Sequence, residues 1–158
     1  MEICYNQIGI IHTSYENSGN VPIQGIFFPD SAGRVVLFDE YADGLLDIEG
    51  FSHIILIYHF HLCKEKRLIV RPYMENKEHG IFAIRSPKRP NAIGLSVVRL
   101  LGREGNELIV GEVDMLDGTP LLDIKPYVSY FDYRENTRTG WVTEDIINRS
   151  DKLSHGKS

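Results

Sequence analysis

The chain has 158 residues, 42% of them hydrophobic and 25% charged, which suits one globular domain and excludes disordered and fibrous proteins. The formal net charge of -5 argues only weakly against a polyanionic partner. The N-terminus lacks a basic region followed by an apolar run, and the two cysteines, Cys4 and Cys63, have no metal or redox spacing. We therefore expect a cytoplasmic protein with reduced thiols that is neither exported nor inserted in a membrane.

Short runs rich in Val, Ile, Leu, Phe or Tyr recur along the chain between Gly, Asn, Asp or Pro residues, a pattern typical of β-strands. They cover residues 5–12, 25–28, 34–38, 53–61, 68–71, 80–84, 95–101, 107–113 and 120–124. Residues 103–106 predict a hairpin turn, because Gly105 and Asn106 tolerate a positive φ. Short helices are expected at residues 39–47 and 143–149, the second with Thr143 as its N-cap.

So many short strands with so few helices predict an all-β protein. We favour a single-sheet β-barrel, which leaves no edge strand unpaired, and keep a β-sandwich as the second choice. Residues 1–135 would form the barrel domain, and residues 136–158 a short helix with a polar tail.

The run from residue 53 to residue 61 carries three histidines at odd positions, His53, His59 and His61, which share one face of a regular strand. His59 and His61 are close enough to bind one metal ion, but a third ligand would have to come from elsewhere. Hydrogen-bonded histidines lining a barrel wall are the more common arrangement, and we expect no metal site.

Basic residues concentrate in the middle of the chain. Residues 64–103 contain ten Lys and Arg against three Asp and Glu. Within this region, Pro87 and Pro90 restrain a loop that presents Arg85, Lys88, Arg89 and Asn91, groups suited to binding a carboxylate or a phosphate. The alternative interpretation is that this stretch is only a structural crossover loop whose charges are solvated.

A third stretch, residues 114–127, combines a turn at Asp117-Gly118 with a strand that carries Asp123 and Lys125. Side chains two residues apart share a strand face, so this carboxylate and this ammonium could form a surface ion pair or act on a ligand. No Gly-x-Gly-x-x-Gly follows a strand, and the sequence therefore gives no sign of a Rossmann-type cofactor site.

Four strings, taken together and in order, resemble the TrmO/TsaA-like (YaeB) family over about residues 5–132. They lie at residues 7–11, 51–53, 80–96 and 117–127, the last beginning Asp117-Gly118-Thr119-Pro120. The resemblance implies a β-barrel enzyme that binds S-adenosyl-L-methionine, works as a homodimer, and methylates N6 of threonylcarbamoyladenosine beside the anticodon of tRNA. Some longer family members carry an additional C-terminal domain.

The resemblance also implies site residues in this chain. The cofactor pocket would be built from Gln24, Gly25, His61, Leu62, Arg85, Leu95, Asp114, Met115, Leu116 and Asp117. Asp117, Asp123 and Tyr127 are the candidates for the proton-transfer role, with Asp123 preferred as the base and Asp123 and Tyr127 retained as the catalytic residues. The substrate would be held by Lys88, Arg89, Asn91 and Lys125.

The rival hypothesis is a non-catalytic barrel that binds RNA or a small metabolite. Such a protein needs only a basic surface and stacking by residues such as Tyr127, Tyr130 or Phe131, whereas an enzyme also needs a cofactor cavity.

Overall fold

The computed structural model describes residues 1–148, which divide into two compact units. The barrel unit comprises Met1–Cys63 and Ala92–Tyr127. The second unit comprises Lys64–Asn91 together with, among the described residues, 128–148. Among residues 1–148, no helix combines the length and the apolar character that a membrane span requires.

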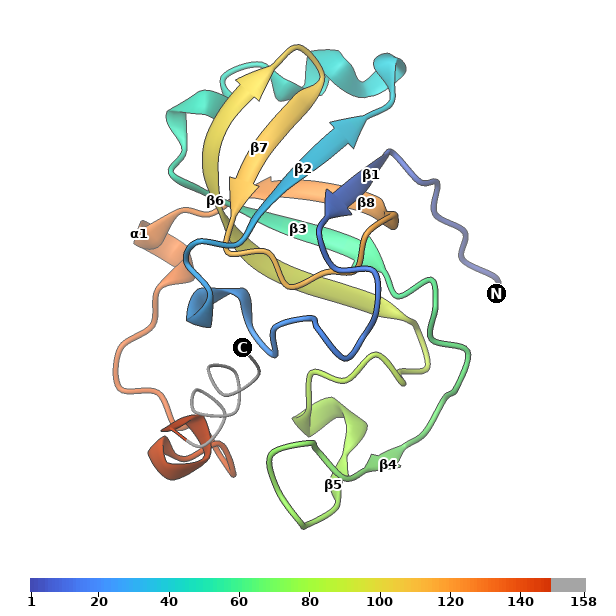
Figure 1. The fold of residues 1–158 in the computed structure, drawn as a ribbon, viewed down its shortest axis with the longest axis vertical. Helices are drawn as coiled ribbons and strands as arrows, with labels where there is room; N and C mark the ends of the chain where they lie inside the picture. Colours follow the sequence, from blue (N-terminus) through green and yellow to red (C-terminus); the bar gives the residue numbers. More distant parts are fainter. Residues whose placement is uncertain (149–158) are drawn as a thin grey trace. The chain divides into compact units, whose positions relative to one another are not determined.

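Six antiparallel strands close the barrel in the order β1-β2-β7-β6-β3-β8 (Figure 1). They are β1 (Gly9–Thr13), β2 (Ala32–Leu37), β3 (His53–His59), β6 (Ile93–Glu104), β7 (Glu107–Gly111) and β8 (Thr119–Pro126). The predicted all-β barrel is therefore confirmed, and the sandwich is excluded, because every strand of this sheet has two neighbours.

Alternation of side chains along the strands builds the barrel core. In β3, Ile54, Leu56 and Tyr58 point inward and are buried, while the residues between them are more exposed. Strand β6 repeats the pattern over its first half, where Ser96 and Val98 are buried. Buried side chains therefore fill the barrel interior.

The predicted hairpin turn at residues 103–106 is confirmed. It joins β6 to β7, whose last ladder pair is Glu104 with Glu107. Gly105 has a φ of +62°, a conformation that side-chain-bearing residues rarely adopt, and this explains why glycine stands there.

Two of the predicted strands are wrong. Residues 25–28 contain the 3₁₀ turn η1 (Gly25–Phe27), and residues 81–83 form another, η4 (Ile81–Ala83), directly after the short strand β5 (His79–Gly80). Both runs are apolar, but Ile26 and Phe82 are 70% and 78% exposed and so do not contribute to the core. An apolar run this short does not distinguish a strand from a tight turn.

In place of the predicted helix at residues 39–47, the chain forms the 3₁₀ segment η2 (Asp39–Leu45), and a second 3₁₀ segment, η3 (Ile48–Gly50), follows it. In the second unit, β4 (Ile69–Val70) pairs with β5, and a short helix, α1 (Ser129–Asp132), follows the barrel. Residues 144–148 are helical, as predicted, whereas Arg149 lies outside the described residues.

Candidate functional site

Two segments far apart in sequence meet at the barrel unit. The backbone N–H of Gly25, at the start of η1, donates to Asp114 Oδ2 at 3.3 Å. The hydroxyl of Ser96 on β6 donates to Asp114 Oδ1 at 2.5 Å and also lies 3.0 Å from the hydroxyl of Tyr58 on β3. The structure therefore brings together two segments that the sequence implied for the cofactor pocket, Gln24-Gly25 and residues 114–117. The Asp114 carboxylate connects them.

Close backbone packing at Gly25 makes this junction selective for glycine. A Cβ on residue 25 would lie 1.7 Å from the carbonyl oxygen of Glu112, so the two backbones could not approach as they do. Glu112 itself has a φ of +61°, and its N–H donates to the carbonyl oxygen of Ser31 at 2.8 Å. The loop before β2 is thus fastened to the loop after β7 at two points.

Asp117 lies where the loop after β7 returns to the end of β1. Its Oδ1 accepts the backbone N–H of Thr13 at 3.1 Å and lies 3.2 Å from Nδ1 of His12. Partial burial acts to raise the pKa of the Asp117 carboxyl, but the hydrogen bonds from Thr13 and His12 and the charge of His12 outweigh it. The net pKa is lowered. The carboxylate is 44% exposed and so remains available to a ligand that donates hydrogen bonds.

The lowered pKa of Asp117 predicts an acid dependence of stability. A carboxyl whose folded pKa is below its unfolded value of about 3.9 stabilises the fold above that pH, and this contribution is lost as the pH falls through the folded pKa. We therefore expect Asp117→Asn to unfold at a lower temperature than the parent near neutral pH. The difference should narrow below about pH 4.

Thermal unfolding of both proteins across this pH range measures the difference. The matched control is Asp39→Asn, which removes another hydrogen-bonded surface carboxylate of the barrel unit. A gap between Asp117→Asn and the parent that stays constant into acid would contradict the assignment.

The remaining cofactor candidates differ in what they expose. Leu62 and Leu95 are 63% and 50% exposed and offer apolar surface, while His61 is half-buried. Gln24 donates its side-chain amide to the carbonyl oxygen of Ile23 at 2.8 Å. Met115 is only 2% exposed, so a ligand would meet its backbone and not its side chain.

Threonine hydroxyls bind backbone carbonyls of the loop after β7. Thr13 Oγ1 donates to the carbonyl oxygen of Met115 at 2.9 Å, and Thr119 Oγ1 donates to that of Leu116 at 2.7 Å. These bonds fix the loop that presents Asp117. The loop is therefore positioned before any ligand arrives.

The predicted sharing of one strand face by Asp123 and Lys125 is confirmed, and the two side chains pair at 2.7 Å. Asp123 Oδ1 also accepts the backbone N–H of Ile124 at 2.9 Å. Asp123 lies on the wall of a largely apolar pocket of about 380 Å³ that also contains Tyr41 and Phe51. Tyr127 packs edge-on against His53, with ring centroids 6.2 Å apart.

The structure does not bring Asp123 beside Asp117. Asp123 lies four positions after Thr119 along β8, which corresponds to about 13 Å of strand at ~3.3 Å per residue. Asp114-Asp117 and Asp123-Tyr127 are therefore two separate groups on the barrel unit.

In the second unit, the basic loop is partly committed to internal contacts. Arg89 donates to the carbonyl oxygens of Ile81 at 3.1 Å and Ile84 at 2.6 Å. Lys88 Nζ lies 2.5 Å from Glu65 Oε2, and the Glu65 carboxylate also forms an ion pair with Arg67. The hydrogen bond from Lys88, followed in size of effect by the one from Arg67, lowers the pKa of Glu65. The side chains of Arg85 and Asn91 are exposed.

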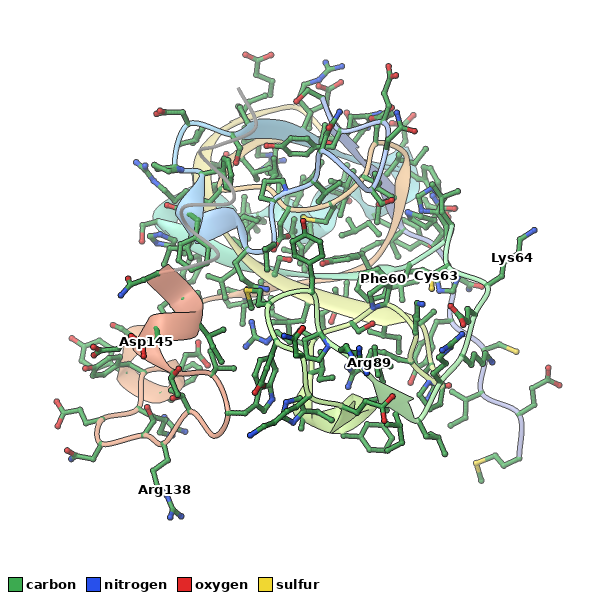
Figure 2. All side chains as sticks on the ribbon, turned by 60° about the horizontal axis from the view of Figure 1, so that its bottom comes forward. Phe60, Cys63, Lys64, Arg89, Arg138 and Asp145 are labelled. Carbon is green, nitrogen blue, oxygen red and sulfur yellow. The ribbon has the colours of Figure 1, made fainter. Side chains whose placement is uncertain are left out.

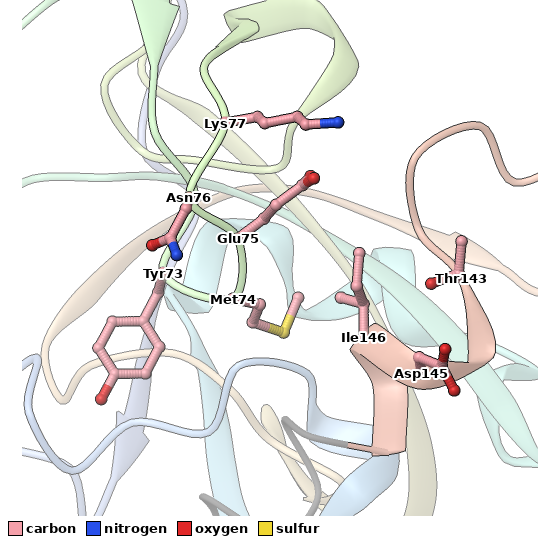
Figure 3. A pocket seen from close by; sticks show the side chains of 8 residues that line it. All are labelled: Tyr73, Met74, Glu75, Asn76, Lys77, Thr143, Asp145 and Ile146. Atoms are coloured by element: carbon pink, nitrogen blue, oxygen red, sulfur yellow. The ribbon is translucent and has the colours of Figure 1, made fainter.

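A pocket of about 410 Å³ also lies in the second unit (Figure 3). It is lined by Tyr73, Met74, Glu75, Asn76, Lys77, Thr143, Asp145 and Ile146. None of the residues implied by the sequence for the cofactor, the substrate or catalysis lies on its wall.

Sequence reasoning did not single out Tyr58, Ser96 or His12, which support the two carboxylates. The alternation of β6 carried a usable signal for one of them, because Ser96 occupies an inward position between apolar neighbours. An inward serine needs a hydrogen-bond partner. Nothing in the local sequence indicates that His12 meets Asp117, 105 residues away.

The three histidines do not share one strand, because β3 ends at His59 and His61 lies beyond it. Within the described part of the chain, no three His, Cys, Asp or Glu side chains are placed to hold one metal ion.

Comparison with known proteins adds an independent line of evidence. The family model described as the tRNA-methyltransferase O N-terminal domain matches residues 10–133. A probable S-adenosyl-L-methionine-binding protein of Pyrococcus abyssi is 58% identical over 144 residues, which cover 91% of this chain and 78% of the relative. The human tRNA (adenine(37)-N6)-methyltransferase is 38% identical over 108 residues, covering 65% of this chain and 24% of its own length.

The crystal structure of TrmO from Pseudomonas aeruginosa superposes with a TM-score of 0.77 at 34% identity and covers 90% of this chain. This chain in turn spans 64% of that protein.

Proposed function

This chain is a member of the tRNA-methyltransferase O family, and on that premise we propose that it transfers a methyl group from S-adenosyl-L-methionine to tRNA. The proposed acceptor is N6 of threonylcarbamoyladenosine next to the anticodon. The match over residues 10–133 carries the proposal, since this range includes η1, the loop after β7 and the basic loop. The names of the relatives from Pyrococcus abyssi and human support the cofactor and the acceptor respectively.

The junction of η1 with the loop after β7 fits the proposed cofactor chemically. Asp117 is an ionised, half-exposed acceptor for hydroxyl or amine donors, and the exposed Leu62 and Leu95 suit the apolar face of an adenine. Arg85 would hold a carboxylate. S-adenosyl-L-methionine supplies a methyl group that its sulfonium already activates, so the chain's task is to position the acceptor and take one proton.

The acceptor nitrogen belongs to a urea, whose delocalised lone pair makes it a poor nucleophile until its proton is removed. We propose Asp123 as the base and Tyr127 as its catalytic neighbour, and Lys88, Arg89, Asn91 and Lys125 as substrate contacts. The position of Asp123 on the wall of a pocket supports this assignment. Its pairing with Lys125 places the carboxylate beside a group that attracts phosphate.

Incubation of the full chain with tRNA and methyl-labelled S-adenosyl-L-methionine tests the proposed activity. Label should enter tRNA that carries threonylcarbamoyladenosine and should not enter tRNA that lacks it. Equal incorporation into both tRNAs would overturn the substrate, and binding of RNA without incorporation would leave a non-catalytic binder.

Arg85→Ala should weaken binding of S-adenosyl-L-methionine about tenfold or more, because it removes a charge-assisted hydrogen bond to the carboxylate. Isothermal titration calorimetry measures the change. Arg71→Ala, at another exposed arginine of the second unit, is the matched control and should bind as the parent does. Unaltered affinity in Arg85→Ala would remove Arg85 from the pocket.

We further propose that the protein works as a homodimer in the cytoplasm. A second copy would double the surface offered to a tRNA and could complete the site, since Asp114-Asp117 and Asp123-Tyr127 are separate groups in one copy. Light scattering at working concentration should give twice the 18.0 kDa mass of one chain. A monomer mass would exclude the dimer.

A further inference from the structure

Charge is distributed very unequally between the two parts of this molecule. The barrel unit, residues 1–63 and 92–127, contains fourteen Asp and Glu against four Lys and Arg. Residues 64–91 contain three acidic and eight basic residues. Arg99 and Arg103, the last two basic residues of the central cluster, belong to the barrel and lie near Glu112 and Glu49. An RNA backbone is therefore attracted to residues 64–91 and repelled by most of the barrel unit.

Within residues 64–91, the turn η4 is held from several sides. Arg89 donates to the carbonyl oxygens of Ile81 and Ile84, and the indole N–H of Trp141 donates to that of Ala83 at 2.8 Å. The N–H of Ile81 donates to the carbonyl oxygen of Leu68 at 2.9 Å, and the Ile81 side chain is buried. Trp141 is itself stacked on His79, with ring centroids 4.6 Å apart. The turn has little freedom to move.

The residue at the centre of this fixed turn is an exposed aromatic. Phe82 is 78% exposed, so the turn holds its ring out into solvent instead of packing it. The guanidinium carbon of Arg89 lies 5.9 Å from the ring centroid. Lys64, Lys66, Arg71 and Arg85 are exposed in the same segment, and Figure 2 shows Lys64 extending into solvent.

We propose that Phe82 is a stacking platform for an unpaired nucleobase of the substrate RNA, an inference that rests on the tRNA methyltransferase activity proposed above. Single-stranded RNA is recognised by a positive surface that follows the phosphates together with aromatic rings on which splayed bases stack. Residues 64–91 combine both, and the fixed turn means that little ordering entropy is lost when a base binds. A paired base has its faces covered by its neighbours and gains nothing from the ring.

The charge of the segment favours RNA over a protein partner as the occupant of this surface. Tyr130, which the sequence also suggested as a stacking residue, is even more exposed than Phe82, but residues 128–148 carry four acidic and two basic residues. That segment would repel phosphates. Residues 64–91 expose two aromatics, Tyr73 and Phe82, and Phe82 is the one that stands on the turn held by Arg89 and Trp141.

Fluorescence anisotropy with the full chain tests the proposal on two labelled RNAs, an anticodon stem–loop and a blunt duplex with the same number of phosphates. Phe82→Ala should weaken binding of the stem–loop about tenfold and leave duplex binding unchanged. Phe82→Tyr should bind as the parent does, whereas Phe82→Leu, which is apolar but not aromatic, should resemble Phe82→Ala. Tyr133→Ala, at an aromatic that is 61% exposed in the acidic segment, is the matched control.

The salt dependence of stem–loop binding separates stacking from a structural role. Loss of the Phe82 ring removes no charge. The slope of the logarithm of the binding constant against the logarithm of the salt concentration should therefore be the same in Phe82→Ala and the parent. Displacement of Arg89 would lower that slope. Equal weakening on both RNAs, a lowered slope, or stem–loop affinity equal to that of the parent would each overturn the proposal.

Methyl transfer measured on the same preparations distinguishes this inference from the proposed function. A parent that methylates tRNA and a Phe82→Ala variant that binds the stem–loop equally well would exclude stacking and leave the activity standing. If Phe82→Ala weakens stem–loop binding but the parent transfers no methyl group to tRNA, the stacking proposal stands and the proposed activity is excluded. A parent that binds no RNA would exclude the platform.

Discussion

Asp123→Asn should lower turnover on saturating tRNA about 100-fold, the contribution expected of a general base. The substitution keeps the shape of the side chain and its bond to the N–H of Ile124, and it removes the charge and the proton acceptor. The Michaelis constant should change little, because the effect falls on the reaction step. Steady-state kinetics with methyl-labelled cofactor measures both quantities.

Two controls interpret the result. Lys125→Met breaks the same ion pair from its other side and should raise the Michaelis constant for tRNA more than it lowers turnover. Glu107→Gln removes a carboxylate from the exposed pair with Arg34 and should affect neither. Near-normal turnover in Asp123→Asn would show that another group acts as the base. An equal loss of turnover in Lys125→Met would show that the ion pair, and not the Asp123 carboxylate alone, is responsible for the effect.

Gly25→Ala should largely abolish binding of S-adenosyl-L-methionine. The new methyl group would lie 1.7 Å from the carbonyl oxygen of Glu112, so η1 has to move away from the loop after β7 and take Gln24 with it. The bond from Gly25 N–H to Asp114 would be lost in the same movement. Overpacking of this kind costs about 1–3 kcal/mol, which urea unfolding can measure.

Gly19→Ala is the matched control, because it lies in the same loop and its added Cβ would meet nothing within 4 Å. Calorimetry should find its affinity for the cofactor equal to that of the parent. If Gly25→Ala is folded by circular dichroism and binds the cofactor normally, the junction of η1 with the loop after β7 is not the cofactor site.

The barrel and its hairpin could be predicted from sequence because their signals are local. Apolar runs rich in Ile, Leu and Val mark β3 and β6, and Gly105 marks the turn between β6 and β7. The 3₁₀ turns η1 and η4 could not be predicted, because the residues that hold them lie far away in sequence. Asp114 holds η1 from 89 residues away, and Trp141 holds η4 from 58 residues away.

For the candidate site, the family resemblance indicated which residues to combine, and the structure places the N–H of Gly25 in contact with Asp114. The motifs did not indicate that Arg89 binds two backbone carbonyls or that Lys88 pairs with Glu65. Charged side chains are flexible enough to choose partners that sequence spacing does not specify.

The antiparallel pairing of β3 with β6 has a consequence for how this family can diversify. His59 is the register partner of Ile93, and the N–H of Phe60 donates to the carbonyl oxygen of Ala92 at 2.8 Å, so the chain leaves the barrel unit and returns at adjacent points. Lengthening a loop whose ends are already together is inexpensive, at about 0.6 kcal/mol for each doubling. Insertion in residues 64–91 can therefore remodel the segment proposed to contact RNA while the strand register of the barrel is inherited unchanged.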